Sequence, residues 1–284
     1  MSKGPIKLCN IKDYDKFIDK FDTFLLDCDG VLWRGDHVIP GVQKALSYMR
    51  KIGKKILFVT NASKSRTGCL EKFKKLNIEA YEDNNTQDPT FDLENIAPDP
   101  EIGAVICAND KNFNYQKLSK ALCYLSRNPD CIFIATTLEA NSQGNCDYPV
   151  PASGTIAVSI LMALGRKPDI IIGKPNKPMM DCIIQNLQLF DAKRICMIGD
   201  RLDTDVQFGI NNGFTTLLTL TGITTENDLL VNNISVQSKS RKFRKLFAAL
   251  QSNLIKSIPN PSPTSIIPDY YISSFGEFSK LDSQ

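Results

Sequence analysis

Short apolar runs that recur along the chain constrain its fold more than any other feature. Most of them are rich in Ile, Val, Leu and Phe and do not alternate with polar residues. Such runs are typical of strands that are buried on both faces, as in a parallel sheet. We expect strands within eight runs, at residues 22–27, 55–60, 103–108, 131–136, 169–173, 194–200, 215–222 and 269–275.

Stretches with helical periodicity separate these runs. Within residues 41–55, apolar positions recur at spacings of three and four, at Val42, Ala45, Leu46 and Met49. Gly53 follows them as a stop signal. Residues 176–190 have the same character. Strands that alternate with helices predict an α/β fold built on a doubly wound parallel sheet.

Composition and charge exclude several classes of protein. The 284 residues, 42% of them hydrophobic, suffice for a sizeable core in one large or two smaller domains. A net charge of +3 gives no argument for nucleic-acid binding. The nine cysteines form no CxxC pair, which indicates reduced thiols in a cytoplasmic protein rather than disulfides or a zinc site. The N-terminus has no apolar signal region, and the longest apolar run, residues 156–164, is too short to span a membrane.

Two segments break the alternation of strands and helices. Residues 79–101 carry eight acidic residues, three prolines and no Lys or Arg, which is typical of a solvated linker at a domain junction. Residues 229–268 contain no acidic residue at all. They predict an insertion with one basic amphipathic helix, which lies on the core or forms a loop rather than binding a membrane or a partner.

Polar residues follow four of the predicted strands. They are Asp27 and Asp29, then Thr60, Asn61 and Ala62, then Lys174, and finally Asp200 with Asp203 and Asp205 close behind. Ligands of open α/β sheets bind beyond the carboxyl ends of the strands. We therefore expect a cluster of carboxylates, one hydroxyl group and one lysine at a single edge of the sheet.

Such a cluster suits phosphoryl transfer. Carboxylates at close range repel each other unless a cation joins them, and all-oxygen ligands favour Mg²⁺. A carboxylate such as that of Asp27 can attack phosphorus and form an aspartyl-phosphate. The second acid, Asp29, could protonate the leaving alcohol and then activate water. Lys174 and backbone N–H groups would hold the phosphoryl charge.

Each of these features alone has a simpler structural interpretation. The DxDG pattern at residues 27–30 could be a turn, Thr60 could cap a strand, and Lys174 could be a surface charge. The acids of residues 199–205 could begin a helix, where the helix dipole favours them. All four in this order, each at a strand end, are hard to explain by structure alone.

Four motifs resemble those of the haloacid dehalogenase superfamily of phosphatases. They are DCDGVLWRG, FVTNAS, GKPNKP and MIGDRLDTDVQFG, which begin at Asp27, Phe58, Gly173 and Met197. The phrases VLWRG, NFNYQKLSKALCYL and LLTLTGIT look most like the branch of 4-nitrophenylphosphatases and eukaryotic phosphoglycolate phosphatases. The resemblance covers residues 20–225 and 267 to the end, and it implies a HAD-like Rossmannoid core.

The resemblance also implies a role for each residue. Asp27 would be the nucleophile and a Mg²⁺ ligand. Asp29 would be the general acid and base, and its backbone carbonyl would bind the metal. Asp200 would also bind Mg²⁺, and Asp205 would support the water shell of the metal or Lys174.

The phosphoryl group would be bound by a second set of residues. By position in the motifs, this set is Thr60, Asn61, Ala62 and Lys174. Lys174 would stabilise both the nucleophile and the transferred phosphoryl group.

The resemblance further implies a cap domain, inserted between Thr60 and Lys174, that closes over the site and selects the substrate. Here the acidic linker replaces the first α/β half of that cap, and ATTLEA stands at residues 135–140 where relatives have ATN-D. We therefore expect a truncated α/β cap. The predicted division is a first core segment at residues 1–90, a reduced cap at 91–168 and a second core segment at 169–284.

The function predicted from these features is that of a Mg²⁺-dependent phosphomonoester phosphatase. Its substrate would be a small metabolite such as 2-phosphoglycolate, with 4-nitrophenyl phosphate as a model substrate. Pyridoxal phosphate or a phosphorylated protein are alternative substrates. A catalytically weak paralogue that binds a phospho-ligand or a partner, and a receiver-type phospho-acceptor, are alternatives of another class. A homodimer stays open, because relatives often dimerise through the cap.

Three further residues have simple interpretations. His37, the only histidine, is expected in an exposed loop. Trp33 is expected to pack beside the turn that contains Asp29. Cys28 is expected to be a buried spacer between the two acids, although a thiol there could also make the enzyme sensitive to oxidation.

Overall fold

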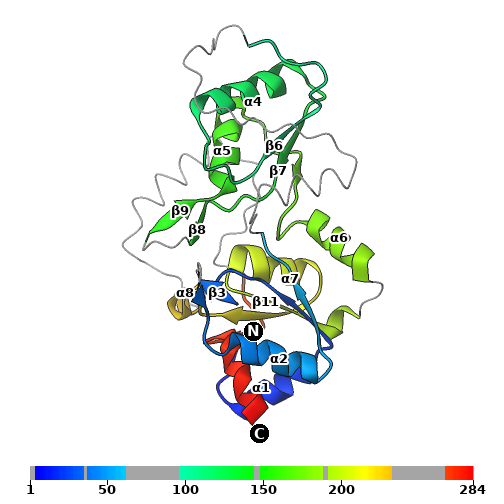
Figure 1. Ribbon diagram of the computed structural model, residues 1–284, viewed down its shortest axis with the longest axis vertical. Helices are drawn as coiled ribbons and strands as arrows, with labels where there is room; N and C mark the ends of the chain where they lie inside the picture. The colour runs from blue at the N-terminus through cyan, green and yellow to red at the C-terminus, as the bar shows by residue number, and fades with distance from the viewer. Residues whose placement is uncertain are drawn as a thin grey trace. The chain divides into compact units, whose positions relative to one another are not determined.

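The computed structural model of the protein describes residues 4–34, 37–61, 96–143, 148–187, 191–231 and 266–283. The chain divides into two compact units (Figure 1). The core unit contains residues 1–60, 143–145 and 174–284, and the inserted unit contains residues 61–142 and 146–173. Along the chain, the inserted unit thus falls between Thr60 and Lys174, the stretch in which the resemblance places a cap.

The main sheet of the core unit has six strands, and all of its neighbouring strands are parallel. Their spatial order is β1 (Ile6–Lys7), β13 (Tyr270–Ile272), β12 (Thr215–Thr219), β11 (Ile195–Gly199), β2 (Thr23–Leu26) and β5 (Lys55–Phe58). The chain runs outward from β2 to β5 and later returns to β11, on the other side of β2. This reversal is a topological switch point, the usual place for a ligand site in such sheets.

Alternate residues of the central strands pack on opposite faces of the core sheet. Phe24 and Leu26 of β2 belong to one apolar cluster, which α1 (Ile11–Ile18), α2 (Val42–Lys51) and the 3₁₀ segment η4 (Phe275–Ser283) complete. Leu25 belongs to a second cluster, with Met180 of α6 (Lys177–Leu187) and Phe208 of α7 (Gln207–Asn211). Figure 1 shows α1 and α2 together beside the core sheet. Helices on both faces confirm the doubly wound α/β fold.

Local sequence signals account for most of these elements. Each of the eight predicted runs contains a strand. The helix predicted after residue 41 is α2, and Gly53 just beyond it adopts a φ of 77°, a left-handed conformation that glycine reaches at low cost. The helix predicted at residues 176–190 is α6, whose described part ends at Leu187.

The main sheet of the inserted unit is smaller and parallel, in the order β10 (Ile170–Ile171), β7 (Ile132–Ala135) and β6 (Ala104–Cys107). The helix α4 (Tyr115–Arg127) joins β6 to β7, and α5 (Ser153–Leu164) lies between β7 and β10 in the chain. Residues of both helices pack around Phe133 in a single apolar cluster. Among the described residues, the two helices of this unit thus pack in one apolar cluster, whereas the core sheet has a cluster on each face.

One strand predicted for the second core segment pairs within the inserted unit. The sequence places the run at residues 169–173 in the second core segment, but its strand β10 pairs with Ile134 and Ala135 of β7. Asp169 strengthens this pairing, because its Oδ2 accepts a hydrogen bond of 2.7 Å from the backbone N–H of Phe133. Along the chain, the core unit ends at Thr60 and resumes at Lys174, apart from residues 143–145. The predicted boundary after residue 90 lies outside the described residues, and the predicted division stays a prediction.

The remaining described elements are short. The two-stranded pairs are β3 (Trp33–Arg34) with β4 (His37–Val38), and β8 (Asn141–Gln143) with β9 (Pro149–Pro151). The other helical segments are η1 (Ala192–Arg194), η2 (Leu202–Val206) and α8 (Glu226–Val231). None of the described helices combines the length and the apolar character needed to cross a lipid bilayer. Residues 62–95 and 232–265, with most of the predicted linker and the basic helix, lie outside the described residues.

Candidate active site

The core sheet brings Asp27 and Asp200 side by side. Asp27 directly follows β2 and Asp200 directly follows β11, the neighbouring parallel strands that flank the switch point. The backbone N–H of Asp27 continues the pairing with a 2.9 Å hydrogen bond to the carbonyl of Ile198. Two residues from distant parts of the sequence therefore end at the same edge of the sheet.

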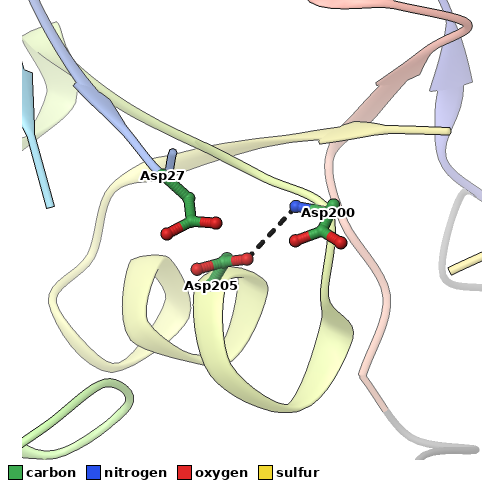
Figure 2. A group of neighbouring side chains, drawn as sticks. All are labelled: Asp27, Asp200 and Asp205. Carbon is green, nitrogen blue, oxygen red and sulfur yellow. Dashed lines mark hydrogen bonds between the residues drawn. The ribbon is translucent and has the colours of Figure 1, made fainter. Parts of the chain in front are cut away.

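Asp205 joins them from η2, the π-helical turn that follows β11. Its approach depends on Gly199, because a Cβ atom at that position would lie 2.1 Å from Cβ of Asp205. One oxygen atom from each of Asp27, Asp200 and Asp205 lies within 4.8 Å of the others, and all three residues are buried. Figure 2 shows the Asp205 carboxylate directed toward the other two.

Lys174 places a buried positive charge against this cluster. Its Nζ donates hydrogen bonds of 2.7 Å to Oδ1 of Asp27, 2.7 Å to Oδ1 of Asp205 and 2.5 Å to the carbonyl of Val59. Only 3% of the lysine is exposed. Three acceptors match the three donors of an ammonium group, so the lysine is held in one position.

The two oxygens of Asp205 are both used within the protein. While Oδ1 pairs with Lys174, Oδ2 accepts hydrogen bonds of 3.1 Å from the backbone N–H groups of Asp200 and Arg201. The carboxylate of Asp200 accepts a bond of 2.7 Å at Oδ2 from the N–H of Ile223. In the described part of the chain, Oδ1 of Asp200 makes no hydrogen bond. Asp205 is thus placed to orient its neighbours, and Asp200 to offer an oxygen to a ligand.

Burial and mutual repulsion shift the acidities of this group. Burial, then the charge of Asp205, raises the pKa of Asp27 from 3.8 to about 7, although Lys174 opposes the shift. Burial, then the charges of Asp205 and Asp27, raises the pKa of Asp200 to about 8. Burial alone would lower the pKa of Lys174, but the carboxylates of Asp205 and Asp27 outweigh it and raise that pKa above its usual value. The lysine therefore stays charged, and the carboxylates attract either protons or a further cation.

Asp29 lies at the turn beyond Asp27 and is only half-buried. Its Oδ1 accepts a hydrogen bond of 2.8 Å from the indole N–H of Trp33, so Trp33 packs beside this turn as expected. Gly30 makes the turn with a φ of 81°, and its N–H donates to the carbonyl of Trp33 at 2.8 Å. Within the described residues, Oδ2 of Asp29 makes no hydrogen bond and is available for proton transfer.

The predicted phosphoryl-binding segment begins next to Val59, a hydrogen-bond partner of Lys174. Thr60 follows Val59, whose carbonyl binds Lys174, so its backbone is close to the lysine. Asn61 belongs to the inserted unit, where its Nδ2 donates a 2.9 Å hydrogen bond to Oε1 of Glu139. Ala62 lies outside the described residues.

Three other residues singled out in the sequence are not members of the carboxylate cluster. Asp203 is exposed and pairs with Arg201 at 3.1 Å. His37 is exposed, although it lies in the short strand β4 rather than in a loop. Cys28 is buried between the two acids, as expected, and its backbone N–H donates to the carboxylate of Asp27.

The segment that holds Asp200 was not predicted from the sequence. This segment, residues 220–224, directly follows β12, and its backbone N–H groups at Ile223 and Thr224 bind Asp200. Its sequence signal is a Thr-x-Thr-Gly pattern at the end of a predicted strand. These residues carry no charge, so they stand out less than the acids and the lysine at the other strand ends.

The arrangement can hold a divalent cation of the Mg²⁺ type. Its donors are carboxylate oxygens, which suit Mg²⁺, and two of the three carboxylates have raised pKa values that a cation would reverse. Asp27 and Asp200 are the natural ligands, because both oxygens of Asp205 are engaged. The residues present therefore fit the metal that the sequence suggested.

Comparisons with known proteins agree with this geometry. A family model described as haloacid dehalogenase-like hydrolase matches residues 24–113, and a HAD-hydrolase-like model matches residues 171–237. A 4-nitrophenylphosphatase of Schizosaccharomyces pombe is 36% identical over 81% of this chain and 94% of that protein. Phosphoglycolate phosphatase 2 of Arabidopsis thaliana is 31% identical over 90% of this chain and 99% of that protein. The crystal structure of a 4-nitrophenylphosphatase from Thermotoga maritima superposes with a TM-score of 0.62 and 26% identity, over 93% of this chain and 98% of that one.

The alignment with the Arabidopsis relative also bears on the length of this chain. It extends over 310 positions, more than the 284 residues present here. The relative therefore has residues that this chain lacks.

Proposed function

This chain belongs to the haloacid dehalogenase-like hydrolase family, and on that premise we propose that Asp27 is its nucleophile, Mg²⁺ its cofactor and a small phosphorylated metabolite its substrate. Within the family it belongs to the branch of 4-nitrophenylphosphatases and phosphoglycolate phosphatases, and it is a phosphomonoester hydrolase. The first candidate metabolite is 2-phosphoglycolate, since a relative with 31% identity is named for that activity. The observation that carries the proposal is the buried contact between Asp27 and Lys174 beside two further carboxylates.

The reaction would proceed in two balanced steps. The carboxylate of Asp27 attacks phosphorus, the bond from phosphorus to the ester oxygen breaks, and the leaving alkoxide takes a proton from Asp29. Asp29, now ionised, accepts a proton from a water molecule while the oxygen of that water attacks the phosphorus of the aspartyl-phosphate. Inorganic phosphate leaves, and both acids return to their starting forms.

The neighbours of Asp27 prepare it for this attack. Lys174 keeps one carboxylate oxygen in a fixed position and would meet the negative charge of the phosphoryl group. Asp205 holds Lys174 from the other side. Trp33 fixes one oxygen of Asp29 and leaves the other for the proton. The proposal also retains Thr60 and the two residues after it, Asn61 and Ala62, as the segment that binds the phosphoryl group.

The proposed metal ligands are Asp27, Asp200 and the backbone carbonyl of Asp29. Bound Mg²⁺ would offset the charge of the carboxylates and of the phosphoryl oxygens. The chain's own contribution is to hold the carboxylates close together and to keep them buried.

Hydrolysis of 4-nitrophenyl phosphate with and without Mg²⁺ tests the proposal. We expect Mg²⁺-dependent turnover by the protein and a fall of about 10³-fold or more in Asp27→Asn, because an amide cannot act as the nucleophile. Asp203→Asn is the matched control and should keep its activity, since that carboxylate is exposed and, within the described residues, its ion-pair partner is Arg201. Equal rates in the protein and in Asp27→Asn would refute the proposed nucleophile.

Two further measurements separate the alternatives. An acid-quenched reaction should contain a short-lived phosphoenzyme that is absent from Asp27→Asn, whereas a receiver-type acceptor would retain it and a weak paralogue would form none. Rates on 2-phosphoglycolate, pyridoxal phosphate and a phosphopeptide would then rank the substrates. A higher kcat/KM on the phosphopeptide would replace the metabolite proposal.

The compartment and the oligomeric state are also proposals. We propose the cytoplasm, in keeping with the free thiols of all seven cysteines in the described residues. We propose a homodimer, by resemblance to the family. Sedimentation velocity of the purified chain would test the dimer, because a monomer and a dimer differ twofold in mass.

A further inference from the structure

The carboxylate of Asp200 lies in a slot between two glycines from different loops. A Cβ atom added to Gly222 would lie 1.8 Å from Oδ2 of Asp200, and one added to Gly30 would lie 2.5 Å from the same oxygen. The Cβ of Gly30 would also come within 3.0 Å of the Cα of Gly222. Neither position can carry a side chain without displacing Asp200 or the facing loop.

The backbone on one side of this slot binds Asp200 directly. The N–H of Ile223 donates a 2.7 Å hydrogen bond to Oδ2 of Asp200, and the N–H of Thr224 donates to the backbone carbonyl of Asp200 at 3.1 Å. These bonds fix both the main chain and one side-chain oxygen of Asp200. They leave Oδ1 as the oxygen that can meet a ligand.

A single hydroxyl group joins the two walls. The Oγ1 of Thr221 donates a 2.5 Å hydrogen bond to the carbonyl of Gly30, and the carbonyl of Thr221 accepts a hydrogen bond from Nε of Arg34. The segment that holds Asp200 is thereby tied to the turn that carries Asp27 and Asp29. Thr221 itself is half-buried and does not belong to the carboxylate cluster.

We infer that Thr221 is a positioning residue which sets the separation of the metal ligands Asp27 and Asp200. Its hydroxyl group holds the segment of Gly222, which forms one wall of the slot around Asp200, against the turn of Gly30, which forms the other wall. The inference rests on the proposed function, because it takes Asp27 and Asp200 as ligands of Mg²⁺. Without the Thr221 hydroxyl, the Gly30 carbonyl loses its partner and the two loops can separate.

Binding of Mg²⁺ alone, measured without substrate, tests this role. The readout is the Mg²⁺ concentration at half-saturation of the folded protein, called the midpoint here. It is obtained by fitting the rise in melting temperature with Mg²⁺ concentration to the affinity of the folded state for the ion. In Thr221→Val we expect the midpoint of this titration to rise about two- to tenfold, the equivalent of one net hydrogen bond. Thr221→Ser keeps the hydroxyl and should return the midpoint close to that of the unchanged protein.

A matched control separates positioning from general stability. Thr225, four residues further on, also donates its hydroxyl, to Oδ2 of Asp228 at 2.7 Å, but it lies before α8 and away from the slot. Thr225→Val should lower the melting temperature with and without Mg²⁺ and leave the midpoint unchanged. An equal rise of the midpoint in Thr225→Val and Thr221→Val would overturn the inference.

The slot itself can be tested with glycine substitutions. Gly222→Ala should raise the Mg²⁺ midpoint more than Thr221→Val does, because the new methyl group occupies the place of Oδ2 of Asp200. Gly103→Ala is the control, since no atom of the described residues lies within 4 Å of its Cβ position. If the unchanged protein and Thr221→Val respond to Mg²⁺ with the same midpoint, the inference about Thr221 fails while the proposed metal stands. If the unchanged protein gives no response, the proposed metal fails and the inference with it.

Discussion

The core unit and the inserted unit use parallel strands in different ways. Every residue of β2 and of β11 is buried, because helices cover both faces of the core sheet. In the inserted unit, β7 alternates: Phe133 is fully buried, whereas the preceding Ile132 is 42% exposed. Among the described residues, the apolar cluster of this unit lies on one face of its sheet.

The difference explains why the charges of the two units behave differently. The core unit buries Asp27, Asp200 and Lys174 at the edge of a sheet with an apolar cluster on each face. Burial and their mutual charges move the pKa values of these residues far from the usual ones. In the inserted unit, the pair of Arg166 and Asp169 is partly exposed, and water screens it. Among the described residues, the strongly shifted acidities of Asp27 and Asp200 thus occur at the edge of the sheet whose two faces are covered.

Removal of the buried positive charge of Lys174 should have the largest effect on the contrast between the two units. In Lys174→Met we expect kcat to fall by about 10²–10³-fold and the free energy of unfolding by about 3–5 kcal/mol, because Asp27 and Asp205 lose their common partner while buried. Urea unfolding at neutral pH and steady-state kinetics measure the two quantities.

Lys177→Met is the control for this substitution. That lysine is also part of a lysine–aspartate pair in the core unit, but its side chain is 81% exposed. We expect a change of at most about 0.5 kcal/mol and no loss of kcat. A comparable loss of stability in both variants would show that burial does not set the strength of the core pairs.

Neighbouring strand residues give the second test. In β11, Met197→Ala and Ile198→Ala should each cost about 2–5 kcal/mol, because the two side chains are buried on opposite faces. In β7, Phe133→Ala should cost about 3–5 kcal/mol and Ile132→Ala less than about 1 kcal/mol. Hydrogen exchange of the amides in each strand reports each unit separately. Similar costs for Phe133 and Ile132 would remove the distinction between the two sheets.

The strands and the carboxylate cluster could be predicted because they depend on local signals. An uninterrupted apolar run indicates a buried parallel strand wherever it lies, and an acid at its end needs no further information to be placed at the sheet edge. The sequence thus located Asp27, Asp200, Asp205 and Lys174, which the structure brings together.

Partners in space could not be predicted in the same way. The run at residues 169–173 has the same composition as the core strands, and only its pairing with β7 assigns it to the inserted unit. The role of residues 220–224 depends on where the end of β12 meets Asp200, a contact between residues 23 positions apart. Such contacts carry little signal in one sequence, because a threonine and a glycine after a strand are also common in turns.

The pH dependence of stability should differ between the units, and the core unit gives the larger effect. Without metal, the pKa values of Asp27 and Asp200 are raised from 3.8 to about 7 and about 8, so the folded protein retains protons that the unfolded chain releases. This contribution is complete below about pH 4 and is lost as the pH rises through about 8. We expect the free energy of unfolding of the metal-free protein to fall by several kcal/mol between about pH 5 and about pH 8, because each retained proton lowers it by about 1.4 kcal/mol per pH unit.

A variant isolates this effect from that of other groups. Asp200→Asn cannot ionise, so its stability should fall less over the same interval, as measured by urea unfolding in the presence of a chelator. A fall of the same size in Asp200→Asn would indicate that groups outside the cluster cause the dependence.

The inserted unit should show a smaller dependence of the opposite sign, centred on Asp169. Its Oδ2 accepts hydrogen bonds of 2.7 Å from the N–H of Phe133 and from Nη2 of Arg166, and these lower the pKa of Asp169. A lowered pKa gives stability that is present above about pH 4 and is lost as the pH falls further. Because the side chain is 42% exposed, we expect Asp169→Asn to cost only about 0.5–1 kcal/mol near neutral pH.

Hydrogen exchange of the β7 amides near pH 7 measures this cost. Asp130→Asn is the matched control, since that exposed side chain makes no hydrogen bond within the described residues and its loss should be neutral. Urea unfolding extended to about pH 3 should show the two variants converging, because the carboxyl of Asp169 then takes up its proton. If Asp169→Asn instead lost more stability in acid, the screened pair would behave like the buried cluster, and the contrast between the two sheets would not hold for charge.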